Sequence, residues 1–161
     1  MAMIGYVLKR ILMVLVGYLV AVLAGLIAVV VIYAILSSLP NAPGYFELME
    51  LTPVAALAVP PLGMFVYFLT IILTGMQTLV FALISELFSL RNFWLHTLFG
   101  AAAATAGFML IWPDAADDPE RWADMSIIAG AGLVAGLIYW LIAGRDAGFR
   151  QPLVKAVPGK A

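Results

Sequence analysis

The sequence predicts an all-α integral membrane protein, built as a bundle of four transmembrane helices with both termini in the cytoplasm. The chain has 161 residues, of which 65% are hydrophobic, and a mean hydropathy of +1.11. Soluble domains contain only about 45–50% apolar residues. Charged residues make up 11% of the chain and lie between long apolar runs. A lipid bilayer is the solvent that fits this composition.

The first apolar run covers residues 11–36 and follows Lys9 and Arg10. As a helix it would extend about 39 Å at 1.5 Å per residue, which exceeds the bilayer core of about 30 Å. The run is longer than the apolar region of a signal peptide, and no Ala-x-Ala-like cleavage site follows it. We therefore expect a retained first span, followed by a turn-rich and acidic outer loop over residues 37–52 that contains no Lys or Arg.

The second span has two alternative starts. Pro60 and Pro61 break or kink any helix that passes through them. We expect the span to cover residues 61–84, which leaves residues 54–59 as a short interfacial or re-entrant segment. A kinked second span that begins at Pro53 is the alternative.

The third and fourth spans are expected at residues 93–112 and 123–143. Residues 85–92 form a short polar connection, so the second and third spans should make an antiparallel hairpin. Asp118 followed by Pro119 is typical of a helix start, which places the beginning of the fourth helix before its span. Residues 145–161 are expected to form a basic cytoplasmic tail.

Positive charge predicts the orientation of these spans, because cytoplasmic flanks are enriched in Lys and Arg. Of the eight basic residues, Arg121 alone falls on the outer side. The others fall on the inner side: Lys9, Arg10, Arg91, Arg145, Arg150, Lys155 and Lys160. The tryptophans fit the two membrane interfaces of the same topology. We therefore expect a multi-pass protein of the cell membrane, taken as a bacterial-type inner membrane, with both termini cytoplasmic.

Few residue types are present that could carry catalysis or hold a cofactor. The chain has no cysteine, and His96 is its only histidine, which excludes thiolate ligands and multi-histidine metal sites within one chain. The acidic residues between Asp114 and Asp124 do not match an EF-hand loop, so no metal is expected. No catalytic constellation, Gly-rich phosphate loop or basic patch with interleaved aromatics is recognisable. We expect no enzyme activity, no cofactor and no nucleic-acid partner.

Two polar features inside the spans are weak candidates for a functional site. His96 lies about one turn into the third span, and an interfacial, hydrogen-bonded histidine is favoured there over a proton relay or a ligand. A polar stripe on the second span consists of Thr70, Thr74, Gln77 and Thr78. It could line a pore, but hydrogen bonds to a neighbouring helix or to the carbonyl one turn back are the preferred interpretation.

Small residues recur on one face of each of the last two spans. Helices in lipid associate largely through close packing of such residues. The predicted packing residues are Gly100, Ala103, Ala104 and Gly107 on the third span, and Ala129, Gly132 and Gly136 on the fourth. We expect the two faces to pack against each other. The alternative turns the face of Gly132 and Gly136 outward, toward a second copy or a partner subunit.

Together these features predict a small non-catalytic membrane protein that is a subunit, scaffold or assembly factor of a larger membrane complex. Its expected partners are the lipid bilayer and other membrane subunits or further copies of itself. The alternative is a small oligomeric channel or carrier for a neutral or apolar solute, with the polar stripe facing its path.

Overall fold

Four long helices make up most of the described chain. The computed structural model describes residues 2–39 and 53–148, so parts of the expected outer loop and of the expected C-terminal tail lie outside the described residues. The helices are α1 (Ala2–Ser37), α2 (Pro53–Phe88), α3 (Phe93–Ile111) and α4 (Pro119–Ile142). Two short 3-10 helices, η2 (Pro113–Ala116) and η3 (Gly144–Asp146), flank α4. Each of the four long helices is long and apolar enough to cross a membrane.

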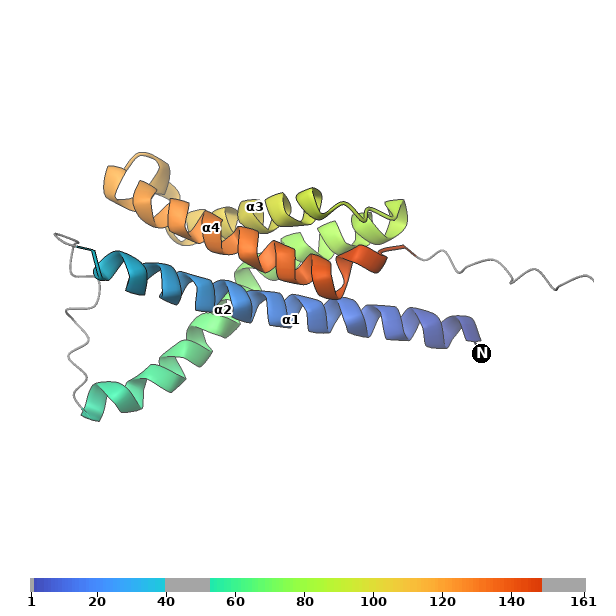
Figure 1. The fold of residues 1–161 in the computed structure, drawn as a ribbon, viewed down its shortest axis with the longest axis horizontal. Helices are drawn as coiled ribbons and strands as arrows, with labels where there is room; N and C mark the ends of the chain where they lie inside the picture. The colour runs from blue at the N-terminus through green and yellow to red at the C-terminus, as the bar shows by residue number, and fades with distance from the viewer. Residues whose placement is uncertain (1, 40–52, 149–161) are drawn as a thin grey trace, which may run out of the picture.

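The helices run back and forth along one axis (Figure 1). Helix α4 lies between α3 and α1, and α2 crosses beside α1 and contacts α3 with its second half. We call one end of the bundle the Arg10 end; α1 and α3 begin there, and α2 and α4 finish there. The opposite end, where α1 finishes, is the Tyr33 end. The first half of α2 diverges from α3 and α4 toward the Tyr33 end.

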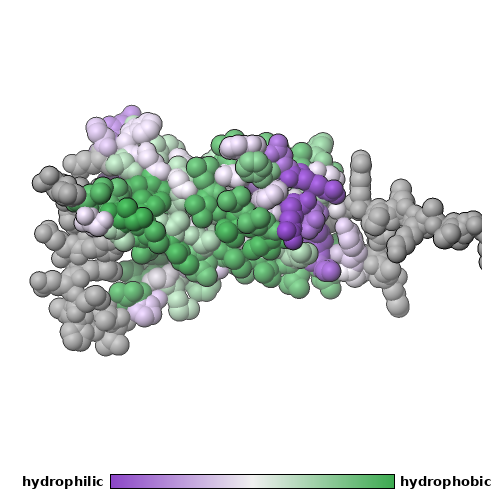
Figure 2. All heavy atoms as spheres, viewed as in Figure 1, coloured by the Kyte–Doolittle hydropathy of each residue, from purple (hydrophilic) through white to green (hydrophobic). Residues whose placement is uncertain are grey.

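The bundle exposes many large apolar side chains. Ile72 and Met76 on α2 are 75% and 74% exposed, and α1 exposes leucine, isoleucine and valine along most of its length. The visible face is hydrophobic across its middle, and hydrophilic residues gather toward the two ends (Figure 2). Soluble monomers rarely expose an apolar area this extensive. An apolar belt between polar ends indicates a helical membrane bundle.

Helix α2 begins earlier than the preferred prediction. It starts at Pro53 and continues through Pro60 and Pro61 as helix, so the expectation of a helix start near Pro61 is wrong. Residues 54–59 form the beginning of this helix rather than a separate segment, which corresponds to the alternative start at Pro53. Proline interrupts the backbone hydrogen bonds of a helix, but helices in apolar surroundings tolerate it where the freed groups are satisfied nearby.

Short polar contacts define the ends of α3 and α4. The side chain of Asn92 accepts a hydrogen bond from the Trp94 backbone amide at 3.0 Å and thereby caps α3. Helix α4 begins at Pro119, the position that the Asp118-Pro119 pair predicts. Arg121, in the first turn of α4, contacts Asp118 at 3.2 Å and lies 4.1 Å above the Trp112 ring. These contacts fix the turn between α3 and α4.

Helices α3 and α4 approach each other backbone to backbone. A Cβ atom added to Gly100 would collide with the Gly132 carbonyl oxygen, and one added to Gly132 would lie 2.8 Å from the Ala104 Cβ. A Cβ on Gly136 would collide with the His96 carbonyl oxygen. Glycine is therefore required at these three positions, because any side chain would force the two backbones apart. We call this contact the α3–α4 seam.

The other predicted packing residues do not all belong to the α3–α4 seam. A Cβ on Gly107 would lie 3.2 Å from the Thr74 Cγ2 and 3.7 Å from the Leu73 Cβ, so Gly107 packs against α2 rather than α4. Ala103 is buried and lines a cavity described below, and Ala129 is half-buried. The expectation that this whole face packs against α4 is therefore wrong at Gly107. The face turns toward α2 because α2 crosses the bundle at an angle (Figure 1).

Helix α1 contacts α4 through a second set of small residues. Built Cβ atoms on Gly17 and Gly25 would each lie 3.2 Å from an alanine Cβ on the α4 side, that of Ala143 and Ala135 respectively. Ala21 lies between the two glycines and is buried with Tyr139. Gly17, Ala21 and Gly25 recur every fourth residue, the small-xxx-small spacing of close helix pairs. This spacing is visible in the sequence, but these three residues were not among the predicted packing residues.

Candidate functional site

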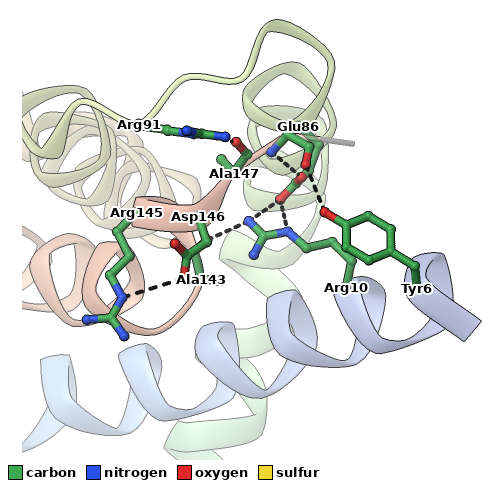
Figure 3. A network of polar contacts seen from close by, with 9 residues as sticks. Tyr6, Arg10, Glu86, Arg91, Ala143, Arg145, Asp146 and Ala147 are labelled. Carbon is green, nitrogen blue, oxygen red and sulfur yellow. Dashed lines mark hydrogen bonds and ion pairs between the residues drawn. The ribbon is translucent and has the colours of Figure 1, made fainter. Parts of the chain in front are cut away.

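A buried ion pair joins α1 to α2 at the Arg10 end (Figure 3). The Arg10 Nη2 lies 2.6 Å from the Glu86 Oε1, and the Arg10 Nε donates to the same oxygen at 2.8 Å. The two side chains are 5% and 6% exposed. Charges buried this deeply require a partner, because removing an unpaired ion from water costs several kcal/mol.

The same two side chains hold the segment that follows α4. The Arg10 Nη2 donates to the Ala143 carbonyl at 2.5 Å, and the Gly148 backbone amide donates to the Glu86 Oε2 at 2.7 Å. The Tyr6 hydroxyl donates to the Gly148 carbonyl at 3.3 Å. Both Glu86 carboxylate oxygens therefore accept hydrogen bonds, and α1, α2 and residues 143–148 meet at one point (Figure 3).

The connection between α2 and α3 bonds both to the end of α4 and to residues 143–148. Arg91 donates from Nε to the Ala147 carbonyl at 2.9 Å, and the Trp140 indole donates to the Arg91 carbonyl at 2.8 Å. Gly148 has a φ of +120°, and a Cβ there would lie 2.5 Å from the Ser89 Oγ. Glycine is required at this position both for its backbone conformation and for the close approach of Ser89.

This network was not predicted from the sequence. Glu86 was expected in the short polar connection over residues 85–92, and Arg10 was expected as a charge flanking the first span. Instead, α2 extends to Phe88, so Glu86 lies in its last turn and faces the interior of the bundle. The available signal was a pair of opposite charges at the same end of two adjacent spans, which apolar surroundings would bring together.

An apolar cavity of about 300 Å³ lies between the four helices. Its walls are mainly aliphatic, aromatic and small side chains. Val29 and Ile111 lie toward the Tyr33 end of the lining, and Phe81 and Tyr139 lie toward the Arg10 end. Its volume corresponds to the lower end of the range for ligand pockets, about 300–1,000 Å³.

The polar stripe is partly on the wall of this cavity. Thr70, Thr74 and Thr78 line it, whereas Gln77 lies outside the lining. Thr70 and Thr74 each donate to the carbonyl one turn back at 2.8 Å. The Thr74 hydroxyl also lies 2.9 Å from the Tyr18 hydroxyl, which donates to the Ile71 carbonyl. Thr70 and Thr74 thus bond to the carbonyl one turn back, and the three threonines also face a cavity.

His96 lies in the first turn of α3 and is only 1% exposed. Its Nδ1 lies 3.0 Å from the Asn92 carbonyl oxygen and donates to it, because a carbonyl can only accept. Phe81 contacts the ring edge to face at 5.2 Å, and Tyr139 stacks on it at 5.8 Å. The ring is therefore hydrogen-bonded and buried among α2, α3 and α4.

Some buried polar atoms at the Arg10 end have unused hydrogen-bonding capacity. Within residues 2–39 and 53–148, the His96 Nε2 and the Ser85 Oγ have no hydrogen-bond partner. A Cβ on Gly144 would lie 2.8 Å from the His96 Nε2, so the ring edge packs directly on that glycine. Unsatisfied buried polar atoms are rare in native structures and call for an explanation.

The Arg10–Glu86 pair has a structural role in this arrangement. Arg10 and Glu86 already satisfy each other, and they link three parts of the chain. Among the described residues no group of three His, Cys, Asp or Glu side chains is placed to hold a metal ion. The cavity supplies an apolar volume beside this end of the bundle. The chain matches no protein-family model, no curated protein sequence and no solved structure.

Proposed function

We propose that the chain is a multi-pass protein of a bacterial-type inner membrane, with both termini in the cytoplasm, that acts as a non-catalytic subunit, scaffold or assembly factor of a larger membrane complex. The main support is the first half of α2, which diverges from the rest of the bundle (Figure 1). We call this apolar half of the helix the arm. Phe65 and Phe68 are 63% and 55% exposed, and a Cβ on Gly63 would have no neighbour within 4 Å. The Tyr67 hydroxyl connects the arm to α1 by donating to the Leu19 carbonyl at 3.1 Å.

An arm of this kind offers a partner helix apolar contact on several sides. In lipid, helices pair through dispersion contacts along a close-packed surface. In the described part of the chain, the second half of α2 packs closely against Tyr18 of α1 and Gly107 of α3. A helix of another membrane subunit would provide the same kind of surface for the first half.

Site-specific photocrosslinking in native membranes tests this proposal. A photoreactive residue in place of Phe65 should give one discrete adduct, and native mass spectrometry should find the same foreign protein in stoichiometric amount. The same residue in place of Leu110 on α3 is a matched control, because Leu110 is equally 63% exposed but lies outside the arm. Lipid adducts alone at Phe65, or the same protein adduct from both positions, would contradict a partner on the arm.

Reporter fusions test the topology separately. Fusions after Thr52 and after Asp118 should report the outer side, and fusions after Ser89 and at the C-terminus should report the cytoplasm. The reason is the excess of Lys and Arg at the Arg10 end, which orients spans toward the cytoplasm. A cytoplasmic signal from the Asp118 fusion would rule out this topology.

A second candidate function is a small oligomeric channel or carrier for a neutral or apolar solute. The cavity between the four helices favours it, since three threonines of the polar stripe lie on the cavity wall. Solute flux into liposomes that contain only the purified chain would support this function. Stoichiometric recovery of a foreign subunit without any flux would support the first proposal instead.

A further inference from the structure

The cavity is the feature of this bundle that a bound molecule would explain best. It lies between all four helices, and its lining consists mainly of apolar and small side chains. Water is a poor occupant of an apolar cavity, because it would lose most of its hydrogen bonds there. A membrane-dissolved molecule can fill it, since hydrocarbon makes the dispersion contacts that an empty cavity lacks. The occupant should therefore have an apolar body.

Hydroxyl groups without a hydrogen-bond partner lie toward one end of the cavity. Thr78, His96 and Tyr139 line it toward the Arg10 end, and His96 and Tyr139 are 1% and 6% exposed. The hydroxyls of Thr78 and Tyr139 make no hydrogen bond to any residue in the described part of the chain, whereas the His96 Nε2 is enclosed against Gly144. Thr70, Thr74 and Tyr18, which line other parts of the wall, all have partners. Unused polar groups thus collect at one end.

The charge near this end is already neutralised. Arg10 and Glu86 lie just beyond Tyr139 at this end, where they bond to each other and to the backbone of residues 143–148. No charged residue belongs to the cavity lining. A ligand with a charged end would lose its hydration without gaining a counter-charge, which is costly in a medium of low dielectric constant. An uncharged polar end has no such penalty.

We infer that the cavity binds an uncharged amphiphile from the membrane, with an apolar chain between the helices and a hydroxyl or carbonyl end beside Thr78, His96 and Tyr139. An apolar pocket with a few polar groups at one end is typical of sites for such ligands. The inference requires the four helices to lie in a bilayer, and it applies to a subunit and to a carrier alike.

Photolabelling of the full chain in lipid nanodiscs tests the site. The probe is a long-chain primary alcohol with a diazirine in the chain, and its competitors are the same unlabelled chain ending in a hydroxyl, a methyl or a trimethylammonium group. Peptides that contain Ala103 and Tyr139 should be labelled, and the alcohol should compete best. Equal competition by all three compounds would overturn the inference that one end of the site recognises an uncharged polar group.

Two variants separate binding in the cavity from contact with bulk lipid. Ala103→Leu places a larger side chain on the cavity wall and should reduce labelling, whereas Ala102→Leu, on the exposed neighbouring residue, should leave it unchanged. Tyr139→Phe keeps the ring but removes the hydroxyl, and it should weaken alcohol binding about two- to twelve-fold, the equivalent of one net hydrogen bond. Unchanged labelling in both Ala103→Leu and Tyr139→Phe would overturn the inference. Labelling of the exposed Ile72 and Met76 by the probe verifies insertion independently, so failure of insertion is distinguishable from an empty site.

Discussion

Glu86→Ala is expected to destabilise the folded chain by about 3–5 kcal/mol, because it leaves the Arg10 guanidinium buried without its counter-charge. The substitution also removes the acceptor of the Gly148 amide, so residues 143–148 should detach from α1 and α2. Reversible unfolding in mixed micelles by sodium dodecyl sulfate measures the loss of unfolding free energy. Hydrogen exchange at residues 143–148 should increase in the same variant.

The double substitution Arg10→Met with Glu86→Leu is the companion variant. It replaces both charges by apolar side chains of similar size, and such replacements of buried ion pairs are often neutral or stabilising. We expect it to be more stable than Glu86→Ala alone. The exposed pair Arg145 and Asp146, with side chains 61% and 66% exposed and 3.6 Å apart, is the control, and its removal should cost less than about 1 kcal/mol. Equal losses from the buried and exposed pairs would contradict this role of Glu86.

The overall architecture could be predicted from the sequence because it follows from the distribution of apolar residues. Four helices long and apolar enough to span a membrane are present, and α4 begins at Pro119 as expected. The ends of the helices were harder to predict from the sequence. A hydropathy pattern ends a span at the first polar residues, whereas α2 continues through Ser85 and Glu86 because other parts of the chain bury them.

The candidate site could not be predicted because it depends on how the helices cross. His96 was identified, but its complete burial results from Phe81, Tyr139 and Gly144, which come from three different elements. Spacing along one helix shows which residues share a face, but not which neighbour that face contacts. Gly107 illustrates this limit, since it shares the small-residue face of α3 but packs on α2.

The cavity, like the candidate site, depends on how the helices cross. Its walls come from all four helices, and it exists because α2 crosses the bundle at an angle instead of packing along α3 (Figure 1). The polar stripe indicated which face of α2 would matter. Which groups would oppose that face, above all Tyr18 and Tyr139, depended on the crossing point.

Gly132→Leu should prevent most of the chain from reaching the folded state. A Cβ on Gly132 would lie 2.5 Å from the Gly100 carbonyl oxygen, and this oxygen cannot move away without moving α3. The larger side chain would therefore separate the two backbones and eliminate the dispersion contacts along the α3–α4 seam. Overpacking of a core typically costs about 1–3 kcal/mol, and we expect at least this loss where backbones touch. The fraction of monodisperse protein after detergent extraction and the unfolding free energy measure it.

Gly130→Leu is the matched control, because a Cβ on Gly130 would meet nothing within 4 Å. Both substitutions replace glycine with leucine near the middle of α4, so their effects on helix propensity are similar and largely cancel in the comparison. Gly130→Leu should thus retain the stability of the unmodified chain, and Gly132→Ala should fall between the two leucine variants. If Gly130→Leu were as destabilising as Gly132→Leu, close contact with α3 would not be the cause. Efficient crosslinking of two chains through Gly132→Cys would instead place this face at an interface between copies, because a residue enclosed in the α3–α4 seam cannot reach a second chain.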